Sequence, residues 1–217
     1  MKIISFSGKK GSGKDTAADI VERILGKENV NRCAFADKLK RVCMEVFKLD
    51  YDQVYGDRKE EAFAKDSVWF LSGEQIAVLE AYCLDRHLRS ADFIVEFYNP
   101  RQILQYVGSN FLRSFDKKIH LRHIPLAEDK INIVTDARFS NELEFLAKKA
   151  LCFSPGPAFN NHLPLYIARE TESTDSHESE SDQTLGHIFI RIVHNHGSIN
   201  ELENKLRGIV IKDWWIK

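Results

Sequence analysis

Residues 2–16 read KIISFSGKKGSGKDT, an apolar run followed by three glycines and a lysine that opens a helical pattern. The apolar run predicts a buried strand. Gly8, Gly11 and Gly13 permit the positive φ angles that turn backbone N–H groups toward an anion. Lys14 and the N-terminus of the following helix add positive charge. The spacing from Gly8 to Lys14 matches the loop that binds nucleoside triphosphates, so this stretch predicts a phosphate-binding loop.

Composition narrows the remaining classes of protein. At 217 residues the chain is long enough for one α/β domain with small insertions. Its 31 Lys+Arg and 32 Asp+Glu nearly balance, so we expect no general attraction to nucleic acid or to an anionic membrane. The four cysteines lack the spacing of a metal site and are interpreted as buried free thiols. No signal peptide or membrane span is recognisable, which favours a soluble cytoplasmic protein.

Strand and helix patterns alternate along the chain. Besides the first strand, we expect strands over 31–36, 131–136, 163–168 and 188–193. Helices are expected over 13–26, after Asp37 as N-cap, over 72–87, from Pro100, over 141–149 and from Ser198. The segment 49–70 is interpreted as irregular. The alternation predicts a parallel sheet covered by helices on both faces, with ligands at the carboxyl ends of the strands.

Two groups of side chains suit phosphoryl transfer. Asp136 ends a buried strand, where a carboxylate can reach Mg²⁺ or its water shell, and Arg138 follows where it can reach a phosphate. A structural Asp–Arg pair is the alternative. Arg101 and Gln105 share one helical face; an arginine fork suits a monophosphate and a glutamine amide suits the edge of a base. A solvated helix face is the alternative there.

Taken together, these segments resemble the bacteriophage deoxynucleoside monophosphate kinases, in order and over nearly the whole chain. The resemblance rests on the loop with its Asp15, 36–40, 101–113, 135–142, Arg169, 175–180 and 195–202. It implies an α/β P-loop NTPase fold, with a parallel sheet flanked by helices as in nucleoside monophosphate kinases. The chain would be a single kinase domain over 1–217. It would carry an inserted acceptor-binding helical segment over about 37–127 and a lid over about 169–183.

The resemblance also implies an activity and a set of roles. ATP would phosphorylate a deoxynucleoside 5′-monophosphate, giving the diphosphate and ADP, with Mg²⁺. The catalytic residues would be Lys14, Asp136, Arg138 and Arg169. The loop residues on ATP would be Gly8, Lys10, Gly11, Ser12, Gly13, Lys14, Asp15 and Thr16. The acceptor residues would be Asp37, Lys40, Arg101, Gln105 and Arg113. Mg²⁺ would be bound by Asp15, Thr16 or Asp136, because Asp15 stands where serine or threonine usually binds the metal.

The expected partner is a small nucleotide, with neither nucleic acid nor membrane, and a homodimer is compatible with this interpretation. A phage-encoded protein would act in the host cytoplasm. The chain also resembles the human-type phosphomevalonate kinases, at the loop, at Asp136 and Arg138, at 178–180 and at 195–197, and they remain the alternative. The helix with Arg101 and Gln105 favours a nucleotide, because an isoprenoid offers no base edge to an amide. A non-kinase P-loop ATPase is less favoured, since a nucleic-acid motor would be expected to show a basic stripe with interleaved aromatics.

Overall fold

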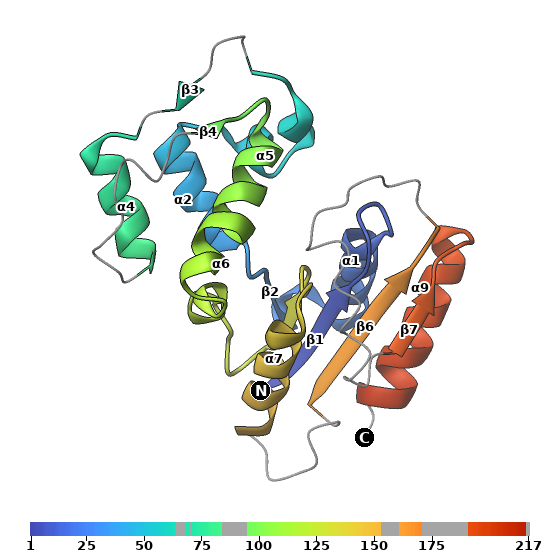
Figure 1. Cartoon of the computed structure of the whole chain (residues 1–217). Helices are drawn as coiled ribbons and strands as arrows, with labels where there is room; N and C mark the ends of the chain where they lie inside the picture. The colour runs from blue at the N-terminus through green and yellow to red at the C-terminus, as the bar shows by residue number, and fades with distance from the viewer. Residues whose placement is uncertain (64–67, 70, 84–94, 153–160, 171–190, 216–217) are drawn as a thin grey trace. The chain divides into compact units, whose positions relative to one another are not determined.

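The computed structural model describes residues 1–63, 68–69, 71–83, 95–152, 161–170 and 191–215. The chain divides into two compact units. The first, which we call the sheet unit, comprises Met1–Phe35 and Ile124–Lys217. The second, the helical unit, comprises Ala36–His123 and interrupts the first in sequence. Its bounds lie within five residues of the segment of about 37–127 that the resemblance implies (Figure 1).

The sheet unit contains five parallel strands in the order β2-β5-β1-β6-β7. Their bounds are β1 Lys2–Ser7, β2 Val30–Cys33, β5 Ile131–Val134, β6 His162–Ala168 and β7 Arg191–His194. β1 is central: Ile4 pairs with Ile133 on β5 and with Leu163 on β6. The predicted α/β architecture with a parallel sheet is confirmed, and it is consistent with a P-loop fold like that of nucleoside monophosphate kinases.

Helices cover both faces of this sheet (Figure 1). α1 (Lys14–Leu25) and α9 (Ile199–Arg207) bury residues such as Ala17 and Leu206 in one apolar cluster with Phe6 of β1. α7 (Ser140–Cys152) connects β5 to β6, in the opposite direction across the sheet from the β1–α1–β2 connection. Because such connections are right-handed, α7 covers the other face. The 3₁₀ helix η1 (Lys27–Asn29) follows α1, and the π-helical η8 (Gly208–Trp215) continues α9.

Two strands end earlier than the sequence predicts, and the reason bears on the site. β2 ends at Cys33 and β5 at Val134, where the predictions extend to residues 36 and 136. The backbone N–H of Phe35 leaves the ladder and donates to Asp136 Oδ1 at 2.7 Å. The residues beyond the strands therefore form a polar connection at the carboxyl edge of the sheet. The predicted residues 188–190 of the last strand lie outside the described part of the chain.

The helical unit has its own apolar core, which includes Phe47, Leu79, Ile103 and Leu112. Its helices are α2 (Asp37–Phe47), α3 (Tyr51–Val54), α4 (Gly73–Cys83), α5 (Pro100–Gln105) and α6 (Leu112–Phe115). The 3₁₀ helices η2 (Asp57–Glu60) and η5 (Ile119–Arg122) and the π-helical η4 (Tyr106–Phe111) complete it, with a short antiparallel pair of β3 (Val68–Trp69) and β4 (Val95–Glu96).

Two local predictions for the helical unit are wrong. The segment predicted as irregular contains regular elements in its described residues, 49–63 and 68–69: Asp50 and Gln53 form a reciprocal capping box that begins α3, and η2 and β3 follow. Asp37 is not the N-cap of α2. Ala36 occupies that position in a helical conformation, with φ −79° and ψ −6°, and no side chain caps the helix there. Asp37 is therefore the first helical residue.

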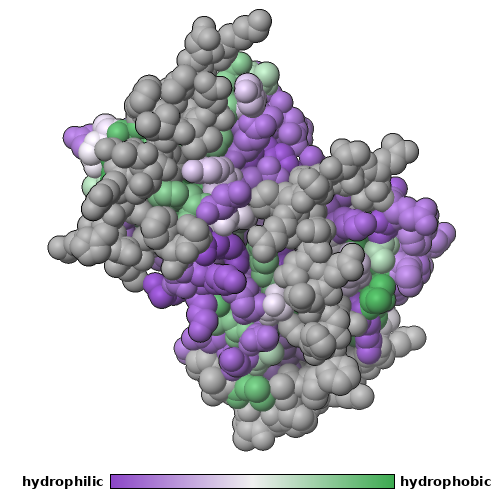
Figure 2. Space-filling model, in the orientation of Figure 1, coloured by the Kyte–Doolittle hydropathy of each residue, from purple (hydrophilic) through white to green (hydrophobic). Residues whose placement is uncertain are grey.

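Other predicted helix starts are confirmed. The Ser72 N–H donates to Gln75 Oε1 at 2.8 Å and the Gln75 N–H to Ser72 Oγ at 3.3 Å, which is the predicted capping box. α4 ends at Cys83, and residues 84–87 of the predicted helix lie outside the described part of the chain. Pro100 is the first residue of α5. Among the described helices, none is long and apolar enough to cross a membrane. Figure 2 shows that hydrophilic residues predominate among the described residues visible on one face.

Candidate active site

The loop between β1 and α1 has the conformation that its glycines predict. Gly8, Gly11 and Gly13 have φ of 140°, 76° and 92°, where other residues would be strained. Gly8 is also constrained by space, because a Cβ there would lie 2.5 Å from the carbonyl oxygen of Ile167 on β6. The loop thus passes directly against the neighbouring strand, and only glycine fits that approach.

Lys14 is the first residue of α1 and folds back over this loop. Its Nζ donates to the carbonyl oxygens of Gly8 at 2.6 Å and Lys9 at 2.7 Å. The ammonium charge is therefore held at the loop, beside the N-terminus of α1. A helix N-terminus, backbone donors and a fixed ammonium together can bind the oxygens of a phosphate chain.

Ser12 lies inside the loop and is fully buried. Its Oγ makes no hydrogen bond with any residue that the structure describes. A buried hydroxyl normally finds a partner, so this one fits a loop whose polar partners arrive with a ligand. The predicted contact of Ser12 with phosphate stays a prediction, as do those of Lys10, whose side chain is exposed, and Gly11.

Asn195, which follows β7, supports the loop and was not predicted as a site residue. Its Nδ2 donates to the carbonyl oxygen of Ser12 at 2.8 Å, and its backbone N–H donates to the carbonyl oxygen of Ala168 at 2.8 Å. A Cβ on Gly13 would lie 2.5 Å from that Nδ2. Asn195 therefore joins the loop to the end of β6. Its position in a polar turn directly after a strand, at the edge of the sheet that carries the loop, is the signal that could have identified it.

The segment after β5 is tied to the end of β1. The Ser7 hydroxyl, at the last residue of β1, donates to the carbonyl oxygen of Ala137 at 2.6 Å. Since Asp136 accepts the Phe35 N–H, the Asp136 carboxylate is held between the ends of β2 and β5. Gly8 follows Ser7 directly, so the structure brings Asp136 to the same strand edge as the phosphate loop.

Arg138 is placed by a buried carboxylate. Glu142 Oε2 accepts the backbone N–H groups of Arg138 at 2.8 Å and Phe139 at 3.1 Å, and only 2 % of Glu142 is exposed. Glu142 thus caps the first turn of α7 and fixes the backbone that carries Arg138. Glu142 thereby positions the segment that carries Arg138.

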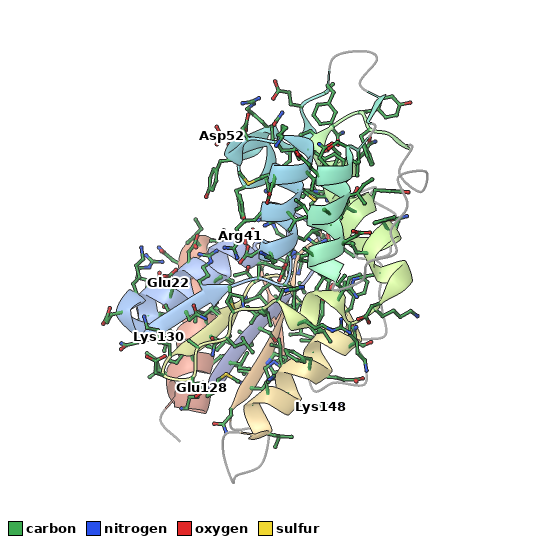
Figure 3. The ribbon with its side chains drawn as sticks, turned by 90° about the vertical axis from the view of Figure 1, so that its left-hand side faces the viewer. Glu22, Arg41, Asp52, Glu128, Lys130 and Lys148 are labelled. Atoms are coloured by element: carbon green, nitrogen blue, oxygen red, sulfur yellow. The ribbon has the colours of Figure 1, made fainter. Side chains whose placement is uncertain are left out.

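The three predicted magnesium ligands lie in different surroundings. The Asp15 side chain is 86 % exposed, and its Oδ1 lies 3.8 Å from Arg32 Nη2. Arg32 also pairs with Asp19 and lies 3.6 Å from Glu22, a residue of α1 that Figure 3 labels. Asp15 therefore belongs to an acidic row along α1, and Arg32 of β2 lies against that row. The Thr16 side chain is exposed in the first turn of α1.

Asp136 is the carboxylate that fits a magnesium ion best. It is half-buried at a strand end beside the loop, and Mg²⁺ takes oxygen ligands, most of them from phosphates and water. In the described part of the chain, no three His, Cys, Asp or Glu side chains gather as a metal site. The roles of Asp15 and Thr16 stay predictions.

Arg169 directly follows β6 and is exposed. Two residues before it, the carbonyl oxygen of Ile167 faces the Gly8 position, so Arg169 lies at the strand end next to the loop. Residues 171–183 of the predicted lid lie outside the described residues.

Asp37 and Lys40 lie together on α2 beside a tyrosine. The Tyr55 hydroxyl donates to the carbonyl oxygen of Asp37 at 3.4 Å, and Lys40 Nζ lies 4.7 Å from the centroid of the Tyr55 ring. Burial, and then the Asp37 carboxylate, raise the pKa of Tyr55 above its ordinary value, while Arg41, labelled in Figure 3, lowers it. The Tyr55 hydroxyl therefore remains protonated and can donate.

The other acceptor candidates lie along 100–115. Arg101 Nε lies 3.5 Å from Glu60 Oε1, and one fifth of the Arg101 side chain is exposed. Gln105 is the last residue of α5, and Arg113 on α6 donates from Nη1 to the carbonyl oxygen of Lys117 at 3.3 Å. The structure thus brings the predicted ATP residues together in the sheet unit and places the predicted acceptor residues in the helical unit.

Comparison with known proteins gives one informative relative. No family model matches the chain. A protein of Acanthamoeba polyphaga mimivirus described as a "Putative deoxynucleotide monophosphate kinase" is 29% identical over 163 residues, which cover 67% of this chain and 68% of that protein. The chain is therefore similar to a viral protein described as a nucleotide kinase, and the likeness is not specific to bacteriophages.

Proposed function

We propose that this chain is an ATP-dependent kinase that phosphorylates a deoxynucleoside 5′-monophosphate. The observation that carries the proposal is the loop of 8–16, in which three glycines with positive φ and the folded-back Lys14 form a phosphate cradle. The name of the mimivirus relative supports a deoxynucleotide as the acceptor. A cytoplasmic protein that acts on a small nucleotide, as a monomer or a homodimer, agrees with this activity.

The reaction needs little covalent chemistry from the protein. An oxygen of the acceptor phosphate attacks the γ-phosphorus of ATP while the bond from that phosphorus to the β,γ-bridging oxygen breaks, giving ADP and the diphosphate. The protein must hold the two reactants in line and neutralise charge on the moving group. In the proposal, the loop N–H groups and Lys14 hold the ATP phosphates, and Arg138 and Arg169, at two strand ends, face the transferred group.

Magnesium fits this site as a companion of ATP. Bound to the phosphates, it would neutralise part of their charge and polarise the phosphoryl oxygens. Asp136 is proposed to hold it, directly or through water, because its carboxylate is fixed beside the loop by the Phe35 N–H.

The acceptor is proposed to bind in the helical unit. Arg101 and Arg113 would bind the phosphate of the monophosphate through charge-assisted hydrogen bonds, and Gln105 would bind the base through its amide. Asp37 and Lys40, beside Tyr55, would lie at the entrance. Glu60, which lies near Arg101, would have to yield that arginine to the ligand.

The experiment is a screen of acceptors with the full chain, ATP and Mg²⁺, in which ADP release is measured. We expect release that depends on at least one deoxynucleoside monophosphate, and far slower release with Lys14→Ala. Turnover with phosphomevalonate alone would favour the isoprenoid alternative. Equal ADP release with and without any acceptor would refute the kinase and indicate an ATPase.

A further inference from the structure

The helical stretch 100–115 is interrupted by a π turn. α5 and α6 are joined by η4, in which the N–H of Leu112 bonds to the carbonyl oxygen of Val107, five residues earlier. In an α-helix that N–H would bond to the carbonyl of Gly108 instead. The Gly108 carbonyl, which is buried, therefore needs another donor.

His120 supplies that donor. Its Nε2 lies 2.9 Å from the carbonyl oxygen of Gly108, and its Nδ1 lies 2.8 Å from the Tyr82 hydroxyl. Because a carbonyl oxygen only accepts, Nε2 carries a hydrogen and donates it to Gly108, while Nδ1 and the Tyr82 hydroxyl bond to each other. His120 and Tyr82 are 6 % and 2 % exposed, so water does not compete for these bonds. The His123 ring stacks on Tyr82 with centroids 4.5 Å apart.

The π turn decides which side chains share a face of the stretch. An α-helix advances about 100° per residue, so Arg113, twelve positions after Arg101, would lie about 120° away around a regular helix. A π turn acts as one extra residue, which reduces that angle by about 100°. Arg113 then lies about 20° from Arg101 and from Gln105, on the same face. The core residues Ile103, Val107, Phe111 and Leu112 are all buried. This agrees with counting the π turn as one extra residue when helix faces are assigned.

We propose that His120 is a positioning residue for the acceptor site: by holding the π turn at Gly108, it places Arg113 in line with Arg101 and Gln105. The inference rests on the proposed function, because these three residues are there proposed to bind the monophosphate. His120 itself touches no substrate. It acts through the carbonyl oxygen of Gly108, which the Leu112 N–H does not reach in the π turn.

The first test compares His120→Leu, which removes the donor, with His120→Gln, whose amide nitrogen can replace Nε2. We expect His120→Leu to raise the KM for the monophosphate by roughly tenfold or more with little change in the KM for ATP, and His120→Gln to recover most of it. Equal changes in both KM values, or no change in that for the monophosphate, would overturn the proposal.

A deletion of Ser109 tests the register directly. Removing one residue of the π segment restores a regular α-helix, leaves Arg113 about 20° from Arg101, and lets the Arg113 N–H, then four positions after Gly108, bond to the Gly108 carbonyl. His120→Leu should then raise the KM for the monophosphate far less in the deletion background than in the wild type. An undiminished effect would show that His120 acts in another way.

His162→Leu is the matched control for loss of a buried histidine. His162 bonds to Ser5 at 2.9 Å in the sheet unit, remote in sequence from the acceptor stretch. It should lower stability and leave the ratio of the two KM values unchanged.

Amide hydrogen exchange separates this inference from the proposed function. We expect His120→Leu, but not His120→Gln, to speed exchange over 107–113, and unchanged exchange would overturn the role of His120 in the turn. A wild-type protein that phosphorylates no monophosphate would refute the proposed function and the acceptor role with it. The exchange measurement would still decide whether His120 holds the turn.

Discussion

The loop of 8–16 and the helical stretch 100–115 hold the groups that are proposed to bind ligands in different ways. In the loop, the donors are backbone N–H groups, and the glycines and the lysine that shape it are local in sequence. In the helical stretch, the candidates are side chains, and their alignment depends on His120 and Tyr82 from other elements. Changes in the loop should therefore act on chemistry, whereas changes around the stretch should act on acceptor binding.

The largest effect is expected at Lys14, which tests most directly whether changes in the loop act on chemistry. Lys14→Ala should lower kcat/KM on the order of 10²–10³-fold with the fold intact, because the ammonium neutralises the transferring charge. Lys9→Ala, a neighbour with an exposed side chain, is the control. A loss below about tenfold would remove the loop from the catalytic machinery.

Arg101 tests whether changes in the helical stretch 100–115 act on acceptor binding. Arg101→Ala should raise the KM for the monophosphate by about 10- to 100-fold and leave that for ATP nearly unchanged, because a charge-assisted bond to the acceptor is lost. Arg122→Ala is the control, since Arg122 is an exposed arginine of the same unit paired with Asp116 at 2.6 Å. A shift in the KM for ATP instead would assign Arg101 to the donor.

The loss of stability at acidic pH should come from His162 in the sheet unit. Burial lowers the pKa of His162 from 6.5 to about 4, so the folded protein keeps this ring neutral while the unfolded chain takes up a proton. The stability that the neutral His162 ring contributes to the folded state is fully present above pH 6.5. It is lost as the pH falls toward 4, and the free energy of unfolding is lower by about 2 kcal/mol at pH 5.

Denaturant unfolding at pH 7 and pH 5 measures this loss. His162→Gln should flatten the pH dependence of the free energy of unfolding between 6.5 and 4. An equally steep dependence in that variant would place the acid-sensitive group elsewhere.

Asn195 tests whether a side chain from outside the loop is needed to hold the loop backbone in place. Asn195→Ala removes the donor to the Ser12 carbonyl and should lower kcat about tenfold without changing the KM for the monophosphate. The exposed neighbour His196 provides the control as His196→Ala. If the monophosphate KM rises while kcat is kept, Asn195 does not act through the loop.

The smallest effect is expected from Gly108→Ala in the π segment. A Cβ there would lie 2.6 Å from Leu39 Cδ2 on α2, and shifting that side chain should cost about 1–2 kcal/mol of stability. Gly208→Ala meets no atom within 4 Å and should be neutral or stabilising by up to about 1 kcal/mol. Thermal unfolding compares the two variants, and equal effects would show that α2 does not pack closely on the π turn.

Much of the sheet unit could be predicted because its signals are local. The apolar runs of β1 and β5 and the helix of α1 ending at Gly26 follow from residue patterns a few positions long. The capping box at Ser72 and the start of α5 at Pro100 were also predictable, because cap chemistry spans three or four residues. The early ends of β2 and β5 were not, since the bond from Phe35 to Asp136 joins distant segments.

By itself, then, the sequence determined the alternation of strands and helices and the glycine conformations of the loop of 8–16, because glycine conformations, helix caps and apolar periodicity are properties of neighbouring residues. Only the tertiary structure decided that Asn195 supports the loop and that a π turn, whose Gly108 carbonyl bonds to His120, changes the face of Arg113. Each of these depends on a buried polar group finding its partner from a distant part of the chain, and no local pattern specifies which partner that will be.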